Sequence, residues 1–260
     1  MRRVALVTGA TGAIGRAIAR AIARTPGWDV VLLARDRARG ERVLGELGVA
    51  SARLELADLS RKHEVRALAE RWRGPLHALV NNAAVAPPRR SETPEGVEVQ
   101  LATNVLSYVW MTELFGAALA AGAREAGEAR VVNVASYWAG DLELDDLELR
   151  RRRYDNDVGY RQSKQANRML TVRYAEALAA DRIQVNACHP GDVSSKLSND
   201  LGFGGSETPE EGADTPVWLA TSDEVAAATG GWYERRRAAR CRFASDRAAI
   251  TALYERCSRY

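Results

Sequence analysis

The 260-residue chain contains only three cysteines, Cys188, Cys241 and Cys257, and they show no spacing typical of a metal site. An odd number of scattered cysteines is typical of a reducing compartment, so we expect a cytoplasmic protein without a metal. No apolar run approaches the roughly 20 residues that span a bilayer. The chain also enters a strand pattern at Arg3, without a preceding signal peptide. We therefore expect no membrane partner.

An excess of charge of one sign is also absent. The net charge is +3 and acidic and basic residues are interspersed, so we expect no nucleic-acid partner. The one basic run, residues 150–153, is more typical of a solvated surface. No linker rich in Pro, Gly or Ser divides the chain, which favours one domain over residues 1–260. Assembly into a homo-oligomer stays open.

Short β-branched and aliphatic runs alternate with amphipathic segments along the chain. We expect strands at residues 4–7, 29–34, 52–56, 76–80, 130–134, 182–187 and 230–234. We expect helices at residues 16–24, 37–47, 61–72, 97–121, 158–175 and 246–259. This alternation predicts the α/β class: a single-domain, Rossmann-like, doubly wound parallel sheet with helices on both faces.

The first expected strand leads into a glycine-rich turn and then a helix. Glycine lets the backbone approach a pyrophosphate, and free N–H groups at a helix N-terminus attract negative charge. A plain tight turn could carry the same glycines, but the strand–turn–helix context favours dinucleotide binding. The residues expected to hold the dinucleotide are Gly9, Thr11, Gly12, Ala13, Ile14 and Gly15.

The second expected strand ends at Arg35, where the adenosine ribose of a dinucleotide would lie. An acidic residue there suits the 2′-hydroxyl of NAD, whereas an arginine suits the 2′-phosphate of NADP. Arg35 therefore favours NADP over NAD, although a solvated charge at a strand end is the alternative. Asp36 is expected to pair with a neighbouring arginine. Asp58, after the third strand, would cap the next helix or bind the adenine amino group.

Polar side chains follow the central strands. Asn81 and Asn82 leave the fourth strand, and their amides need partners in a structural turn or in a cofactor cleft. Asn104 lies inside the helix expected at residues 97–121, where asparagine is a weak helix former and would need partners if buried. Ser136 follows the fifth strand and opens onto the ligand side of a parallel sheet.

Tyr160 and Lys164, four residues apart, share one face of the helix expected at residues 158–175. An ammonium group beside a phenol favours the phenolate, so we expect the pKa of the phenol to fall from about 10 towards neutral. Such a pair can transfer protons. An exposed tyrosine and lysine that happen to fall at helical spacing are the alternative.

Beyond the sixth expected strand, Pro190 and Gly191 break the chain sharply. We interpret the preceding His189 as structural, because no other metal ligand stands at a suitable spacing. Residues 196–207 contain three glycines, as a mobile lid would. Thr208 is expected to start a helix as its N-cap.

Together these residues resemble the short-chain dehydrogenase/reductase family over nearly the whole chain, and more narrowly its retinol-dehydrogenase-like branch. The matching motifs are residues 8–15, Arg35, Asp58-Leu59, Asn81-Asn82-Ala83, Asn104, Ser136, Tyr160-x-x-x-Lys164 and Pro190-Gly191. The branch is indicated by Arg35-Asp36, the long interval from Ser136 to Tyr160, His189-Pro190-Gly191 and Thr208-Pro209-Glu210-Glu211-Gly212. Departures from the family pattern are Ala13 and Ala84, where glycine is usual, and Asp192, a charge near the nicotinamide end.

The resemblance implies that Tyr160 is the general acid/base and that Ser136 hydrogen-bonds the reacting oxygen. Lys164 would lower the phenol pKa and hold the nicotinamide ribose, and Asn104 would support a water-linked proton relay through Lys164. The further cofactor contacts that it implies are Leu59, Asn82, Ala83, Pro190, Gly191, Val193 and Ser195.

The expected function is an NADP(H)-dependent oxidoreductase that transfers a hydride between nicotinamide and a small carbonyl or alcohol substrate. One alternative is a non-redox cyclase, dehydratase or epimerase that uses Tyr160 as general acid. Another is a nucleotide-sensing module without chemistry. The presence of all four residues Asn104, Ser136, Tyr160 and Lys164 disfavours it, since binding alone would not need them. Specificity should lie in residues 86–92, 137–157 and 196–207, whose aromatic side chains suggest an apolar or aromatic substrate.

Overall fold

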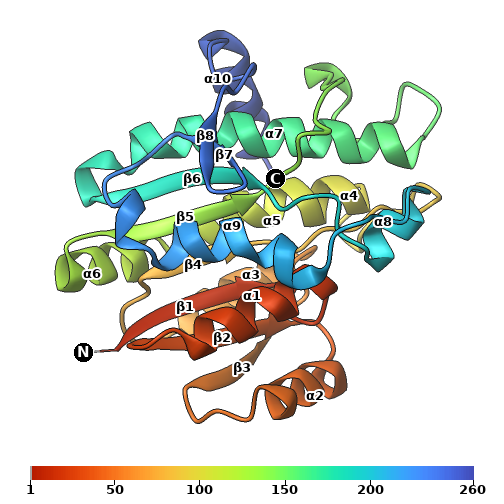
Figure 1. Ribbon diagram of the computed structural model, residues 1–260. Helices are drawn as coiled ribbons and strands as arrows, with labels where there is room; N and C mark the ends of the chain where they lie inside the picture. The colour runs from red at the N-terminus through yellow and green to blue at the C-terminus, as the bar shows by residue number, and fades with distance from the viewer. Residues whose placement is uncertain (1) are drawn as a thin grey trace.

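Eight strands form one sheet in the computed structural model, which describes residues 2–260, in the order β3-β2-β1-β4-β5-β6-β7-β8 (Figure 1). Strands β1 to β7 are parallel, and β8 is antiparallel to β7. The strands are β1 Arg3–Thr8, β2 Trp28–Ala34, β3 Ala52–Leu56, β4 Ala78–Asn81, β5 Ala129–Val134, β6 Ile183–His189, β7 Trp232–Glu234 and β8 Arg237–Ala239. The predicted α/β class and parallel sheet are confirmed.

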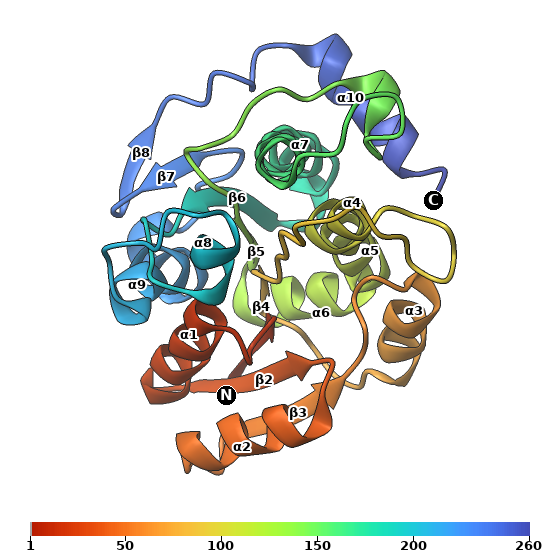
Figure 2. The same ribbon diagram turned by 90° about the vertical axis from the view of Figure 1, so that its right-hand side faces the viewer.

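Helices cover both faces of this sheet, as the predicted doubly wound fold requires (Figure 2). They are α1 Ala13–Arg24, α2 Arg37–Leu47, α3 Lys62–Arg71, α4 Val99–Leu101, α5 Ser107–Leu114, α6 Gly116–Ala126, α7 Asn156–Ala177, α8 Lys196–Asp200, α9 Pro209–Thr221 and α10 Arg247–Cys257. Short 3-10 turns occur at Leu144–Asp146, Ala179–Asp181 and Asp223–Val225. Helices α1, α2 and α9 pack on one face, and α3, α5, α6, α7 and α10 on the other.

The two cores follow from the alternation of side chains along the strands. Ala5 and Val7 of β1 point to the core beneath α1, where they meet Ile18 and Ile22. Leu6 between them points to the opposite core. Because both faces are covered, the central strands are apolar at successive positions instead of alternating with polar residues.

The single helix predicted at residues 97–121 is wrong. The chain forms α4, a π-helical turn at Ala102–Leu106, and then α5 and α6, with a bend of 57° between Val99–Leu114 and Gly116–Ala126. The bend lets α6 approach β4: a Cβ on Gly122 would overlap the carbonyl oxygen of Leu76 and lie 2.7 Å from its carbonyl carbon. The backbone N–H of Leu76 also donates to the carbonyl of Ala118 at 2.9 Å.

Within residues 2–260 no single helix is long and apolar enough to cross a membrane. The bent pair Val99–Leu114 and Gly116–Ala126 meets the length and composition requirement only when its two parts are taken together.

The carboxyl-terminal part of the sheet also differs from the prediction. The strand expected at residues 230–234 is present as β7, but its antiparallel partner β8 was not expected. Arg235 and Arg236 join the two strands, and both have positive φ values, 49° and 59°. Residues 196–207, expected to be irregular, contain the short helix α8.

Candidate active site

Most of the predicted site residues gather at one edge of the sheet, because they follow the carboxyl ends of parallel strands. The six strand-end positions, taken from β1 to β6, are Gly9, Arg35, Asp58, Asn82, Ser136 and Pro190. Helix α7 carries Tyr160 and Lys164 to the same edge, beside β5 and β6.

The glycine-rich turn after β1 is shaped for a close backbone approach. Gly9 has a φ of 63°, and a Cβ on Gly15 would overlap the carbonyl oxygen of Gly9. Helix α1 begins after Gly12, which offers no side-chain cap, and its first turn contains no acidic residue. The first N–H groups of α1 therefore stay available to an anion, and the helix dipole favours one. These residues fit the pyrophosphate of a dinucleotide.

Asn82, directly after β4, ties that strand to the end of β1, where the glycine-rich turn begins. Its side-chain amide donates to the carbonyl of Thr8 at 2.8 Å, and its backbone N–H donates to the Thr8 hydroxyl at 2.8 Å. The backbone N–H of Ala83 donates to the same hydroxyl at 3.0 Å. The sequence analysis did not single out Thr8. Its position as the last polar residue of β1, directly before Gly9, is the signal that could have done so.

At the end of β2, Arg35 extends into solvent with 74% of its side chain exposed, and its guanidinium lies 3.9 Å from the carboxylate of Asp58. The expected pairing of Asp36 with an arginine side chain is wrong, because Asp36 caps α2 by accepting from the backbone N–H of Arg39 at 2.8 Å. Asp58 does not cap α3 either, which begins after Arg61.

Asp58 instead forms a tight turn with Ser60, from which it accepts a backbone N–H at 3.0 Å and the hydroxyl at 2.8 Å. It lies three residues before the cap position Arg61, too early to reach the first turn of α3. Its second oxygen lies 3.9 Å from the guanidinium groups of both Arg35 and Arg61. This end of the edge is thus a small cluster of one carboxylate and two arginines.

Tyr160 and Lys164 are both buried on α7. The ammonium nitrogen of Lys164 lies 5.5 Å from the centroid of the Tyr160 ring and 5.6 Å from that of Tyr108. It donates one hydrogen bond, of 2.9 Å, to the carbonyl oxygen of Val134 at the end of β5. Since an ammonium group has three donors, two remain for other partners.

Burial dominates the protonation of this pair. It raises the pKa of Tyr160 to about 12, against the opposing effect of a hydrogen bond with Ser136. It lowers the pKa of Lys164 to about 7. The predicted fall of the phenol pKa is therefore wrong for the protein alone, because desolvation of the phenolate is the largest effect and the nearby carboxylates Asp192 and Asp157 add to it.

Asn104 is fully buried in the π-helical turn, and both ends of its amide are bonded. Its oxygen accepts from the backbone N–H of Val85 at 2.8 Å. Its nitrogen donates to the carbonyl of Val85 at 2.9 Å and to the hydroxyl of Ser163 at 3.2 Å. Asn104 thus joins the loop after β4 to α7, which it contacts at Ser163, the residue before Lys164. Ser163, which lies inside the Tyr160-x-x-x-Lys164 motif, completes this link.

Ser136 is buried, and its hydroxyl accepts from the backbone N–H of Trp138 at 3.0 Å. The following Tyr137 and Trp138 are exposed. Tyr137 meets the imidazole of His189 edge-on, with ring centroids 4.7 Å apart. Trp138 packs against Phe203 with centroids 5.3 Å apart. Two of the three predicted specificity segments therefore touch beside the reacting groups.

After β6 the chain turns at Gly191, whose φ is 96° and whose missing Cβ makes room for the carboxylate of Glu207. Val193 is buried and forms an isolated bridge with Glu207. Ser195 caps α8, since its hydroxyl accepts from the backbone N–H of Ser198 at 3.1 Å. Thr208 starts α9 with a capping box, as expected.

The imidazole of His189 is mostly buried, and burial lowers its pKa below the ordinary value. In the part of the chain that the structure describes, no three His, Cys, Asp or Glu side chains are arranged to hold a metal ion. The nearest charged group is Asp192, 4.0 Å from its Nε2 atom.

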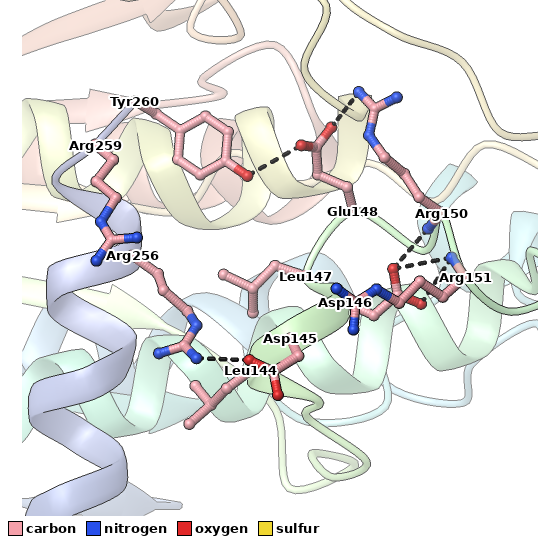
Figure 3. A pocket seen from close by; sticks show the side chains of 10 residues that line it. All are labelled: Leu144, Asp145, Asp146, Leu147, Glu148, Arg150, Arg151, Arg256, Arg259 and Tyr260. Carbon is pink, nitrogen blue, oxygen red and sulfur yellow. Dashed lines mark hydrogen bonds and ion pairs between the residues drawn. The ribbon is translucent and has the colours of Figure 1, made fainter.

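A separate cavity of about 500 Å³ lies away from the reacting groups, between residues 144–151 and α10 (Figure 3). Its carboxylates already have partners: Asp145 pairs with Arg256 at 2.6 Å, and Glu148 pairs with Arg150 at 2.9 Å. The carbonyl of Leu147 accepts from the side chain of Gln162 on α7. The basic run is thus part of a folded surface segment.

A parallel α/β sheet with a glycine turn and a buried Tyr–Lys pair at its carboxyl edge defines a nicotinamide-dinucleotide oxidoreductase architecture. The family model described as "short chain dehydrogenase" matches residues 3–202, and the chain belongs to that family, in its retinol-dehydrogenase-like branch.

Curated relatives agree with this assignment. The chain is 36% identical to carbonyl reductase (NADPH) 3 of Rattus norvegicus over 260 residues, 84% of this chain and 90% of that protein. It is 30% identical to human retinol dehydrogenase 14 over 266 residues, 89% of this chain and 77% of that protein. Among solved structures, 3-ketoacyl-(acyl-carrier-protein) reductase of Brucella melitensis, complexed with NADH, is 26% identical with a TM-score of 0.72, covering 89% and 96% of the two chains.

Proposed function

We propose that this protein is an NADP(H)-dependent oxidoreductase that interconverts the carbonyl and alcohol forms of a small apolar or aromatic substrate. The observation that carries the proposal is the convergence of Ser136, Tyr160 and Lys164, all buried, beside an exposed aromatic rim. The similarity to carbonyl reductase (NADPH) 3, whose name includes NADPH, supports the choice of NADP(H) as coenzyme.

NADPH would supply the hydride that adds to the carbonyl carbon. Tyr160 would give its phenolic proton to the carbonyl oxygen, so that hydride and proton together produce the alcohol. With its pKa raised to about 12, the phenol is protonated at neutral pH in the protein alone, so the proton to be donated is in place. Ser136, which shares a hydrogen bond with Tyr160, would hold the same oxygen and orient the carbonyl towards the phenol.

Lys164 would hold the nicotinamide ribose with the two donors that Val134 leaves free. Its pKa of about 7 lets it accept or release a proton near neutral pH, so it can return a proton to Tyr160 after each reduction. Asn104 is a positioning residue in this proposal, because its amide is taken up by Val85 and Ser163. A remaining lone pair on its oxygen would accept from a relay water.

The remaining assignments concern the cofactor alone. Arg35 would bind the 2′-phosphate, and Asp58 with Leu59 would contact the adenine. The first turn of α1 and the residues before it would bind the pyrophosphate. The nicotinamide end would be lined by Ala83, Pro190, Gly191, Val193 and Ser195. Asn82 would act by holding Thr8 and the glycine turn in place.

The test is NADPH consumption, followed by its absorbance, across a panel of aromatic and aliphatic ketones and aldehydes. Tyr160→Phe should lower kcat by a factor of about 10²–10⁴ and leave NADPH binding intact, since only the proton donor is lost. Tyr254→Phe, on α10, is the matched control and should keep full turnover. Wild-type rates in Tyr160→Phe, or product formed without any change in NADPH absorbance, would refute the proposal.

A further inference from the structure

Three exposed aromatic side chains lie close to Ser136: Tyr137 and Trp138 directly follow it, and Phe203 packs against Trp138. Their exposed fractions are 50% for Tyr137, 37% for Trp138 and 39% for Phe203, and Val49 is the only other large apolar residue among residues 2–260 that is comparably exposed. Exposed aromatic groups that gather at one place mark a binding surface. Trp138 lies two residues after Ser136, so this rim, defined by Tyr137, Trp138 and Phe203, borders the reacting groups.

Asp192 adds a charge to the same rim. Its side chain is 46% exposed. Among the described residues, the Nε2 atom of His189, 4.0 Å away, is the one basic side-chain nitrogen that lies within ion-pair distance of its carboxylate. Burial lowers the pKa of His189 below its ordinary value, which favours the neutral imidazole over the cation. Tyr137 packs edge-on against the same imidazole. The carboxylate of Asp192 therefore stands next to an exposed aromatic ring without a cation.

The other acidic side chains near this edge have partners. Glu234, opposite His189 in the sheet, has no ion pair within residues 2–260 but accepts from the indole N–H of Trp232 at 2.7 Å. Glu207 pairs with Arg235 at 3.2 Å. Asp141 pairs with Arg161 at 2.9 Å, and Asp157 shares the same guanidinium at 3.9 Å. Asp192 is thus the carboxylate at the rim whose charge is left for a ligand. Its field reaches the reacting group, since it is among the charges that raise the pKa of Tyr160.

We propose that the substrate carries a positive charge, as a protonated amine, on an apolar or aromatic body. The amine would pair with Asp192 while the body packs on Trp138 and Phe203 and the carbonyl or hydroxyl meets Tyr160. Aromatic faces also attract cations, so the rim and the carboxylate favour the same ligand. An anionic substrate would be repelled. This inference rests on the proposed oxidoreductase function, whose site it refines.

The test uses three ketones of one shape and three charges: 4-(aminomethyl)acetophenone, 4-ethylacetophenone and 4-acetylphenylacetate. The Kd of each is measured by calorimetry with the NADPH complex of the Tyr160→Phe variant, which lacks the proton donor, and kcat/KM is measured with the wild-type enzyme by NADPH absorbance. We expect the amine to bind roughly fivefold more tightly than the neutral ketone and the acid roughly fivefold more weakly, as for a partly exposed charge pair. Raising the salt to about 0.5 M should shrink both ratios, because exposed charges are screened.

Asp192→Asn should bring the amine-to-neutral ratio close to one. The matched control is Asp223→Asn, which removes an exposed carboxylate near Arg3 at the opposite edge of the sheet and should keep the ratio. The Kd values of NADP⁺ and NADPH are measured for the same variants. If Asp192→Asn changes the ratio of those two values and not the order of the ketones, the carboxylate serves the cationic nicotinamide and the inference is overturned.

The two proposals fail in distinguishable ways. Turnover of the neutral ketone without any preference among the three charges would overturn the cationic substrate and keep the oxidoreductase. Absence of NADPH consumption with every ketone would overturn the oxidoreductase, and the order of the Kd values would still decide whether the rim selects a cation.

Discussion

Replacing Arg35 by alanine should change the coenzyme preference of this protein. In the proposed complex Arg35 meets the 2′-phosphate, a group that NADPH carries and NADH lacks. The variant should therefore bind NADPH more weakly and NADH as before. The guanidinium is 74% exposed and lies 3.9 Å from Asp58, so the phosphate would compete with a carboxylate that is already present.

The size of the effect follows from this exposure. Two unit charges about 4 Å apart interact by about 1 kcal/mol in water and about 4 kcal/mol at the lower effective dielectric of a protein surface. Because Arg35 is mostly in solvent and partly neutralised by Asp58, the value near the lower limit applies. A loss of about 1 kcal/mol corresponds to a roughly fivefold rise in the KM for NADPH.

The assay is steady-state kinetics with both coenzymes at a saturating concentration of one ketone, at low and moderate salt. The control for net charge is Arg42→Ala, which removes an exposed arginine from α2, seven residues after Arg35 in the chain. Equal use of NADPH and NADH by the wild-type protein would refute the phosphate assignment. So would an Arg35→Ala variant in which both coenzymes lose affinity in parallel.

Two further predictions concern stability. Gly122→Ala should destabilise the protein by about 1–3 kcal/mol, because a Cβ there would overlap the backbone of Leu76, whereas Gly116→Ala, with open space around it, should be neutral or stabilising. Equal urea midpoints for the two variants would contradict the close approach of α6 to β4. Burial lowers the pKa of Lys164 from 10.5 to about 7, so between these two pH values the unfolded chain binds one proton more than the folded protein. The free energy of unfolding of the cofactor-free protein should therefore rise as the pH increases from 7 to 9. The rise is at most about 1.4 kcal/mol per pH unit. In urea titrations at constant ionic strength, Lys164→Met should flatten this slope, and a slope that persists would show that another group causes it.

The parts of this structure that the sequence predicts are those with local causes. The turn after β1 needs glycine because Gly9 has a positive φ and Gly15 has no room for a Cβ. Tyr160 and Lys164 share a face because helical spacing places them there. The motifs after the strands meet at one edge because parallel strands all end on the same side of a sheet.

The missed features depend on contacts between distant segments or on unusual local chemistry. The hairpin of β7 and β8 turns through Arg235 and Arg236 at positive φ, where Asn-Gly would have been the recognisable signal. The break before α6 accompanies a close approach of Gly122 to Leu76, 46 positions earlier in the chain, which the local sequence does not reveal. The pKa of Tyr160 moves upwards because of burial, which spacing along a helix does not reveal.

The π-helical turn at Ala102–Leu106 sets the rotational phase of the segment before α5. The N–H of Ser107 bonds back to the carbonyl of Ala102, five residues earlier, so this turn holds one residue more than an α-helical turn. Deleting one residue here would restore the α-helical repeat and rotate everything upstream by about 100° relative to α5. Asn104 would then point away from Val85 and Ser163. The length of this turn therefore constrains the protein more strictly than the identity of most residues within it.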